Sequence, residues 1–235
     1  MSAEDAAEVA DAARTTRGGD AGARVADRLR HEILAGEHAP GTRIRQEDVA
    51  ERFGASRVPV REALRILENE GLVTLVANTG AWVATLTLAE CEEVYQMRER
   101  LEPLLLSYSA PHLSPDDLAD LAELAERMAA TDDLDLFLGL DRKFHLASYR
   151  GARTSQLGEL VTKLWNTTQP YRRAYTHSID ADARRIMHDE HHLLVSALRD
   201  DDLEEAQRVL ASHIRRTRRQ LSRHPELFTD LGAPR

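Results

Sequence analysis

The sequence predicts a mainly α-helical protein, with an N-terminal winged helix-turn-helix followed by an all-helical antiparallel bundle of about six helices. Apolar residues recur at helical spacing along most of the 235 residues, and residues 72–83 combine β-branched residues with turn residues. Short connections between the later helices favour antiparallel neighbours around a common core. We expect a disordered tail, a winged head, a helical body and a C-terminal tail, over residues 1–20, 21–85, 86–225 and 226–235.

The composition limits where the protein works and what it binds. A single cysteine, Cys91, excludes an internal disulfide framework and any cysteine-cluster metal site, and it suits a reducing cytoplasm. No segment approaches the roughly 18 consecutive apolar residues of a membrane-spanning helix. The first 20 residues lack the apolar core of a secretory signal. We therefore expect a cytoplasmic protein with no membrane partner.

The net charge of −9 argues at first against a protein that binds polyanions. The surplus acid lies outside the head, however: residues 1–20 hold five acidic and two basic side chains, and residues 86–235 hold 26 and 20. Residues 21–85 hold nine of each. The charge therefore leaves nucleic acid open as a partner, and it predicts weak non-specific affinity and a steep loss of binding as salt rises.

The head divides into three helices and two strands that form a hairpin, predicted over residues 22–36, 46–53, 57–70, 72–76 and 81–83. Ser56 is placed as the N-cap of the third helix, after a short turn that begins at Gly54. Gly71 ends that helix, as glycine often does. Three helices, a glycine turn and a following hairpin match the geometry in which the third helix enters the DNA major groove.

Three arginines line the exposed face of the third helix. Arg57, Arg61 and Arg65 are spaced i, i+4 and i+8, opposite an apolar stripe formed by Val60, Ala63, Leu64 and Leu67. Such a row can neutralise phosphates and contact guanine edges. A merely solvated arginine face is the other interpretation that the spacing leaves open.

The stretch from Pro40 to Val73, above all Ser-Arg-x-Pro-Val-Arg-Glu-Ala-Leu at residues 56–64, resembles the winged-helix signature of the GntR family of bacterial transcription regulators. The resemblance implies that Arg57 and Arg61 contact an operator and that the hairpin tip is the wing. Glu62 is expected to orient Arg61 or to cap the helix. The DNA-binding candidates are Arg45, Gln46, Ser56, Arg57, Pro59, Arg61, Arg65, Asn78, Thr79 and Gly80.

The body is predicted to hold six helices, over residues 87–109, 115–130, 133–149, 154–177, 181–199 and 202–223. Three of them send polar residues toward the core, because Asp141, His145, His191 and His213 each share a helix face with apolar residues. Buried together, a carboxylate and three imidazoles need a common partner, and a divalent metal provides one. A single inward histidine is more often a hydrogen-bonded core residue, so the spacing alone leaves both interpretations open.

Residues 87–222 resemble the all-helical C-terminal domain called FCD that many GntR regulators carry. The resemblance rests on Val94 to Glu102, Asp141-x-x-Phe-His145, Glu190-His191 and His213. It implies a metal held by Asp141, His145, His191 and His213, with zinc favoured over nickel or manganese, and a small carboxylic acid bound beside it. Six helices rather than seven point to the VanR-like branch.

An arginine is expected to clamp the far end of such an acid through a bidentate pair. Arg98 is the first candidate, and an ion pair with Glu102 is an equally weighted alternative. The other effector-binding candidates are Asn166, Tyr171, Arg172 and Arg173.

Together these features predict a ligand-responsive repressor that binds a palindromic DNA operator as a homodimer and responds to a small organic acid. A metal sensor, in which the ion is itself the signal, is the alternative. A metal-dependent hydrolase or lyase is a remote third reading, and we expect no enzyme. No His-Glu-x-x-His helix is present. Besides Asp141, no inward carboxylate is evident that could serve as a general base beside the metal, because Glu190 points about 100° away from His191 on its helix.

Overall fold

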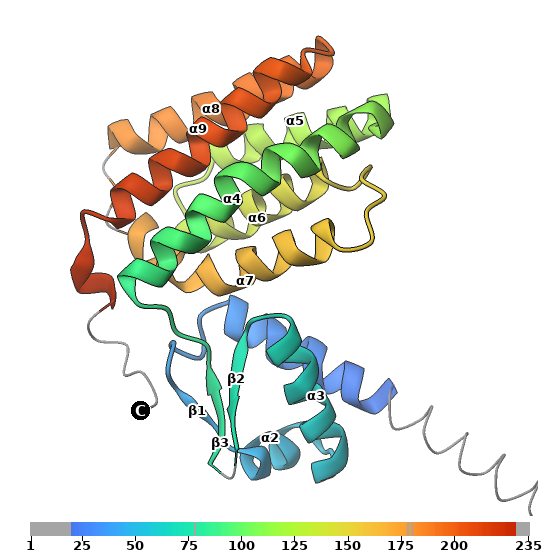
Figure 1. Ribbon diagram of the computed structural model, residues 1–235, viewed down its shortest axis with the longest axis vertical. Coiled ribbons are helices and arrows are strands. Elements are labelled where there is room, and N and C mark those ends of the chain that lie inside the picture. Colours follow the sequence, from blue (N-terminus) through green and yellow to red (C-terminus); the bar gives the residue numbers. More distant parts are fainter. Residues whose placement is uncertain (1–19, 78, 178, 180, 229–235) are drawn as a thin grey trace, which may run out of the picture. The chain divides into compact units, whose positions relative to one another are not determined.

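The computed structural model describes residues 20–228 except 78, 178 and 180 (Figure 1). The expected tail, residues 1–20, lies outside the described residues except for Asp20, which is helical. The chain divides between Thr85 and Leu86 into two compact units, called the head and the body below. None of the described helices is long and apolar enough to cross a membrane.

The head contains three helices and a three-stranded antiparallel sheet with the strand order β1-β3-β2. The first helix covers residues 20–34. The elements after it are β1 Arg43–Ile44, α2 Gln46–Phe53, α3 Arg57–Asn69, β2 Val73–Val76 and β3 Gly80–Val83. The prediction of a two-stranded hairpin was incomplete because Arg43 and Ile44 pair with Trp82 and Ala81. A strand of two residues is too short to show a period in the sequence.

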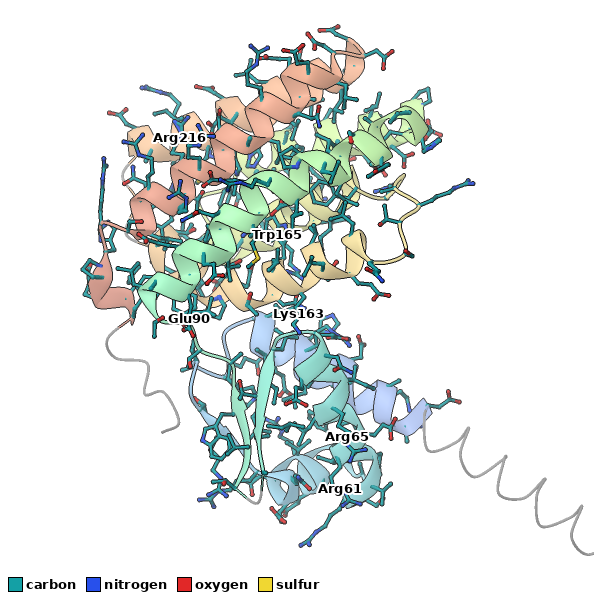
Figure 2. All side chains as sticks on the ribbon, viewed as in Figure 1. Arg61, Arg65, Glu90, Lys163, Trp165 and Arg216 are labelled. Carbon is teal, nitrogen blue, oxygen red and sulfur yellow. The ribbon has the colours of Figure 1, made fainter. Side chains whose placement is uncertain are left out.

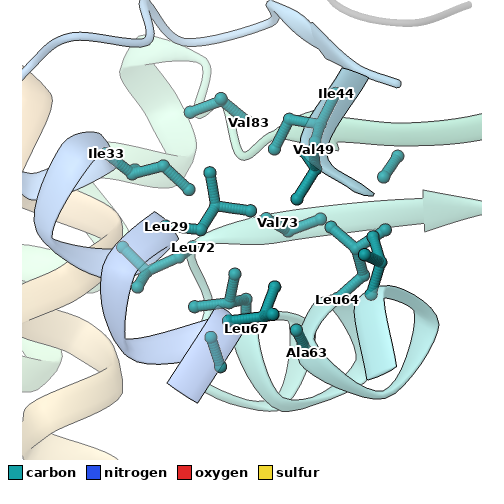
Figure 3. Close-up of a cluster of buried hydrophobic side chains, with 14 residues drawn as sticks. Leu29, Ile33, Ile44, Val49, Ala63, Leu64, Leu67, Leu72, Val73 and Val83 are labelled. Atoms are coloured by element: carbon teal, nitrogen blue, oxygen red, sulfur yellow. The ribbon is translucent and has the colours of Figure 1, made fainter. Parts of the chain in front are cut away.

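The head core is formed by apolar side chains from all three helices and the sheet (Figure 3). On α3 the predicted stripe is confirmed, since Val60, Ala63, Leu64 and Leu67 are all buried. Gly54 and Gly71 follow α2 and α3 with φ of +63° and +75°, in the left-handed region that favours glycine. Two sharp helix ends thus turn α3 against the sheet.

The body is a bundle of six long helices, as predicted: α4 Leu88–Ser109, α5 Pro115–Ala129, α6 Leu134–Ser148, α7 Leu157–Thr176, α8 Ala181–Arg199 and α9 Leu203–Leu221. Helix α4 packs against α7 and α9, α5 packs against α6 and α8, and α8 packs against α9 (Figure 1). Short 3-10 helices lie at Ala110–His112 and Pro225–Phe228. The Phe228 ring stacks on Tyr171 at 4.7 Å, so residues expected to begin a tail at 226 pack on α7.

Side chains cap the body helices. Thr87 and Ser114 each form a capping box at the start of α4 and α5, and Asp133 accepts from two backbone N–H groups of α6. In the head, Ser56 occupies the N-cap of α3 as predicted, but its side chain makes no capping hydrogen bond. Its hydroxyl is exposed and available for another partner.

Candidate functional site

A groove of about 350 Å³ lies in the head between α3 and the β2–β3 turn. Five of the predicted DNA-binding residues line it, and Figure 2 labels two of them on α3; the five are Gln46, Arg61, Arg65, Thr79 and Gly80. Arg61 and Arg65 are exposed, and neither forms an ion pair with another of the described residues. The groove therefore carries exposed guanidinium groups beside a turn whose backbone approaches them.

The other candidates lie around this groove. Arg45 is exposed at the N-cap of α2. Arg57 is 73% exposed and lies 3.4 Å from a Glu47 carboxylate oxygen. Ser56 and Pro59 line a separate hollow against the helix of residues 20–34. Asn78 lies outside the described residues.

Two details of this face differ from the expectation. Among the described residues Glu62 forms no ion pair with Arg61, and its side chain instead packs so closely on Gly22 that a Cβ added to Gly22 would lie 2.6 Å from Glu62 Cγ. Arg43 was overlooked: it donates from Nη2 to the Thr79 carbonyl at 2.7 Å and covers the Trp82 ring. Arg43 thereby fixes the turn from a strand that the periodicity did not reveal.

In the body, the four predicted polar residues come together from three helices. Asp141 and His145 lie on α6, His191 on α8 and His213 on α9, and one ligand atom from each lies within 4.8 Å of the others. Asp141 Oδ1 lies 3.3 Å from His191 Nε2 and 3.8 Å from His145 Nε2. Asp141, His145 and His191 are at most 2% exposed, and His213 is 6% exposed.

The residues present fit a divalent metal. Asp141 Oδ1 and both ring nitrogens of His145 and His191 are buried without a hydrogen-bond partner. Burying such atoms unpaired is costly, since each loses its water on folding, and one ion would take three of the five: Asp141 Oδ1 and one ring nitrogen from each histidine. Ligand bonds of about 2.0–2.2 Å place donors on one ion up to roughly 4.2 Å apart, close to the spacing observed. A nitrogen-rich set with one carboxylate suits zinc, nickel or manganese.

Second partners hold two of the four ligands. Arg172 on α7 donates from Nη1 to Asp141 Oδ2, the carboxylate oxygen that faces away from the cluster. Glu190 accepts from His213 Nδ1 at 3.0 Å and from Arg216 Nη2 at 2.5 Å, and Figure 2 labels Arg216. A carboxylate on the outer ring nitrogen fixes the tautomer, so His213 Nε2 is the atom free to ligate.

Glu190 is a second carboxylate close to the four ligand candidates, and both of its oxygens are bound to side chains of α9. Glu190 is 8% exposed and accepts from His213 Nδ1 on α9. The packing of α8 on α9 brings His213, one of the four ligand candidates, to the Glu190 carboxylate. The contact lies between helices, so the spacing within α8 could not show it.

The pKa shifts of Asp141, His145 and His191 favour the protonation states that bind a cation. Burial lowers the pKa of His145 well below its usual range and that of His191 to about 4, so both imidazoles are neutral at pH 7. Burial opposes ionisation of Asp141, but Arg172, His191 and His145 outweigh it and hold its pKa well below the usual range. One carboxylate and neutral imidazoles are the protonation states that a metal needs.

Arg98, the first effector-binding candidate, is used inside the body. Its Nε donates to Glu102 Oε1 at 2.5 Å and its Nη1 to Thr168 at 2.9 Å. Tyr149 and Trp165 donate to the other Glu102 oxygen. The structure therefore contains the ion pair that the sequence left as the alternative role of Arg98.

The remaining effector-binding candidates also have partners within the chain. Arg172 pairs with Asp141, and Arg173 pairs with Asp135. Asn166 accepts from Arg142 at 2.6 Å. The Tyr171 hydroxyl accepts from the backbone N–H of Leu86 and donates to its carbonyl. Of these residues, Arg172 is the one in direct contact with a metal-ligand candidate.

Known proteins resemble both units. Residues 21–83 match the family model described as bacterial regulatory proteins, gntR family, and residues 93–216 match the FCD domain. The HTH-type transcriptional regulator McbR of Escherichia coli K12 is 28% identical over 191 residues, covering 80% of this chain and 86% of that protein. The gluconate operon transcriptional repressor of Bacillus licheniformis is 30% identical over 192 residues, covering 77% and 76%.

Solved structures agree with these matches. The structure of E. coli McbR/YncC has a TM-score of 0.76 at 27% identity and covers 87% of this chain and 98% of its own. The crystal structure of a GntR transcriptional regulator from Rhodococcus sp. RHA1 has a TM-score of 0.70 at 25% identity. The match covers 85% of this chain and 96% of that one. The matched relatives are transcription regulators rather than enzymes.

Proposed function

This chain belongs to the GntR family of bacterial transcription regulators and carries its FCD domain, and from that premise we propose that it is a ligand-responsive repressor. It binds a palindromic operator as a homodimer, and a small carboxylic acid bound at the metal site of the body releases or remodels it. The observation that carries the proposal is the buried Asp141, His145, His191 and His213 cluster, whose inner atoms have no other partner in the described chain. Assignment to the VanR-like branch stays a prediction.

The DNA-binding half of the proposal is supported by the groove beside α3. The first turns of α3 present Arg57, Arg61 and Arg65 to solvent, while the opposite side of the helix is buried in the head core. In winged helix-turn-helix proteins the recognition helix reads base edges, and nearby backbone and cationic groups hold the phosphates. Thr79 and Gly80 bring the turn to the same groove, where the wing would contact the operator.

A homodimer is supported by apolar residues that the body leaves exposed. On α4, Leu104 is 43% and Tyr108 52% exposed, and on the neighbouring α7 Leu160 is 42% exposed. A second copy would bury these side chains, and two heads would then read two half-sites about one helical turn apart. The first and fourth body helices are those that the sequence pattern favours for this contact.

The response to an organic acid is supported by the charges around the cluster. A bound divalent ion supplies positive charge and coordination positions for carboxylate oxygens. Arg172 already holds Asp141 from α7, and Glu190 holds His213 from the other side. A ligand that alters these contacts changes the packing of α7 and α9, and it shifts the equilibrium between two arrangements by its differential affinity for them.

The alternative is a metal sensor, in which the ion alone changes DNA binding. The same cluster would be its metal site. The hydrolase or lyase reading has no support, since the relatives are regulators and the one carboxylate that the structure adds, Glu190, is already paired with His213 and Arg216.

The test uses a duplex that the protein itself selects from a random pool. Its affinity is measured by fluorescence anisotropy with metal-free protein, with zinc-loaded protein, and with a panel of small carboxylic acids added to each. We expect an acid to weaken binding at least tenfold only in the zinc-loaded protein. A change caused by zinc alone identifies the metal sensor, and a metal-free protein that responds equally to the acid contradicts the proposed site.

A further inference from the structure

The C-terminal part of α9 concentrates positive charge in a body that is acidic as a whole. Between Ala206 and Pro225 the chain has six arginines and no carboxylate residue. Four of them, Arg215, Arg216, Arg219 and Arg223, line a groove of about 350 Å³ against α8. We propose that this groove, the α8–α9 groove, binds a small oxyanion with two or more negative charges, at a site separate from the carboxylic acid site proposed at the metal.

The groove has the composition of a site for such an anion. No carboxylate residue lines it; the other lining residues include Ser212 and Gln220 from α9 and the partly exposed Ile186 from α8. Arg215 and Arg219 lie one helical turn apart, about 6 Å along the axis, which matches two separated anionic groups. Arg215 Nε also lies 3.4 Å from a Glu99 carboxylate oxygen, so it is shared with that residue. Guanidinium forks bind both carboxylate and phosphate in a bidentate manner, and Ala183 and Ile186 of α8 offer an apolar surface to a carbon skeleton between two charges.

Several of these cations are not satisfied inside the protein. In the described chain, Arg219 and Arg223 lie within 4.0 Å of no carboxylate, and Arg223 contacts only the side-chain oxygen of Gln220. Arg216 Nε is buried and has no hydrogen-bond partner, although its Nη2 is bound to Glu190. Basic residues at a helix C-terminus favour the helix dipole, but that effect does not require them to converge on a groove.

Arg216 connects the α8–α9 groove with the proposed metal centre. The chain of contacts runs from Arg216 to Glu190 and from Glu190 to His213 Nδ1. An anion that draws Arg216 into the groove leaves more of the Glu190 charge on His213, which raises the basicity of a metal ligand. This connection rests on the proposed metal centre, whereas binding of the anion does not.

The binding test uses full-length, metal-free protein and two probes, pyrophosphate and glutarate, in isothermal titration calorimetry. We expect at least one of the two probes to bind. The double substitution Arg219→Ala with Arg223→Ala should weaken that binding at least tenfold. Arg208→Ala is the matched control, because Arg208 lies on α9 outside the groove and pairs with Glu205. Which probe binds more tightly distinguishes phosphate chemistry from dicarboxylate chemistry.

Three results would overturn the site: neither probe binding the wild type, Arg208→Ala weakening binding as much as the double variant, or the double variant changing the mass from light scattering. The last result would make the groove an interface between copies of the chain.

The connection from Arg216 through Glu190 to His213 is tested separately, by the zinc affinity of Arg216→Ala in competition with a chelating dye. We expect several-fold tighter binding than in Arg208→Ala; equal or weaker binding refutes the connection, and no zinc binding by either variant or the wild type refutes the metal centre itself.

Discussion

The interiors of the head and the body differ in polarity: the core of the head is apolar, whereas the body also buries polar and charged side chains. Every core residue of the head is hydrophobic, and Arg57, Arg61 and Arg65 lie exposed on α3. All sixteen buried polar or charged residues in the described chain belong to the body. An apolar core fixes the exposed arginines by shape alone, whereas the body depends on buried charges that must be paired. Substitutions should therefore separate stability from function in the head and couple them in the body.

The largest expected effect is the loss of the Glu102 carboxylate in the body. Glu102→Ala leaves Arg98 buried without its counter-ion and removes the acceptor of Tyr149 and Trp165, so we expect a loss of about 3–5 kcal/mol in the free energy of unfolding. Urea denaturation measures it. The control is Glu70→Ala, which breaks the half-buried Arg30–Glu70 pair of the head and should cost about 1 kcal/mol. Equal costs would contradict the contrast between the two interiors.

The second effect is a pH dependence confined to the body of the metal-free protein. The pKa of His191 is about 4 in the folded state, below the ordinary value of 6.5, and that of His145 is lowered as well. The unfolded chain therefore binds more protons between these values, and stability falls as pH drops from about 6.5 to 4, by about 3 kcal/mol for His191 alone.

Thermal unfolding of chelator-treated protein across this pH range checks the prediction. His191→Gln should flatten the dependence, and His31→Gln, a substitution of an exposed head histidine, should leave it unchanged. A wild type whose stability is constant between pH 6.5 and 4 would show that the buried imidazoles do not carry the effect.

A third prediction concerns Glu190, the carboxylate behind His213. Glu190→Gln keeps the size of the side chain but removes the charge that orients and polarises the imidazole, so we expect zinc affinity to fall 10- to 100-fold. Competition with a chelating dye measures it. Glu126→Gln, a substitution of an exposed acid 3.9 Å from His192, is the control and should leave the affinity unchanged.

In the head, Arg61→Ala should act on function alone. We expect about tenfold weaker operator binding and a change in unfolding free energy within about 0.5 kcal/mol, because the side chain is exposed at the groove and is not part of the core. Anisotropy with a selected duplex and urea denaturation give the two numbers. A large loss of stability would contradict the division of roles between core and surface.

The same contrast explains what the sequence could predict. The periodicity of α3 and α6 identified which residues face inward, because a helix face is fixed by spacing alone, and so Asp141 and His145 were placed correctly. Partners between helices depend on how the helices pack. Glu190 meeting His213, Arg172 meeting Asp141 and the buried Glu102 network all cross from one helix to another. In the head, β1 was missed because Arg43 and Ile44 are too few to show a pattern.

The smallest effect compares two helix caps. Thr87 forms a capping box at α4, so Thr87→Ala should cost about 1 kcal/mol of stability. Ser56 occupies the same position at α3 without a capping hydrogen bond, so Ser56→Ala should cost only a few tenths. If the hydroxyl serves the operator instead, Ser56→Ala weakens DNA binding while urea denaturation stays at the wild-type midpoint. A stability loss equal to that of Thr87→Ala, with DNA binding unchanged, would show that Ser56 is an ordinary cap and that the head also uses its polar groups for folding.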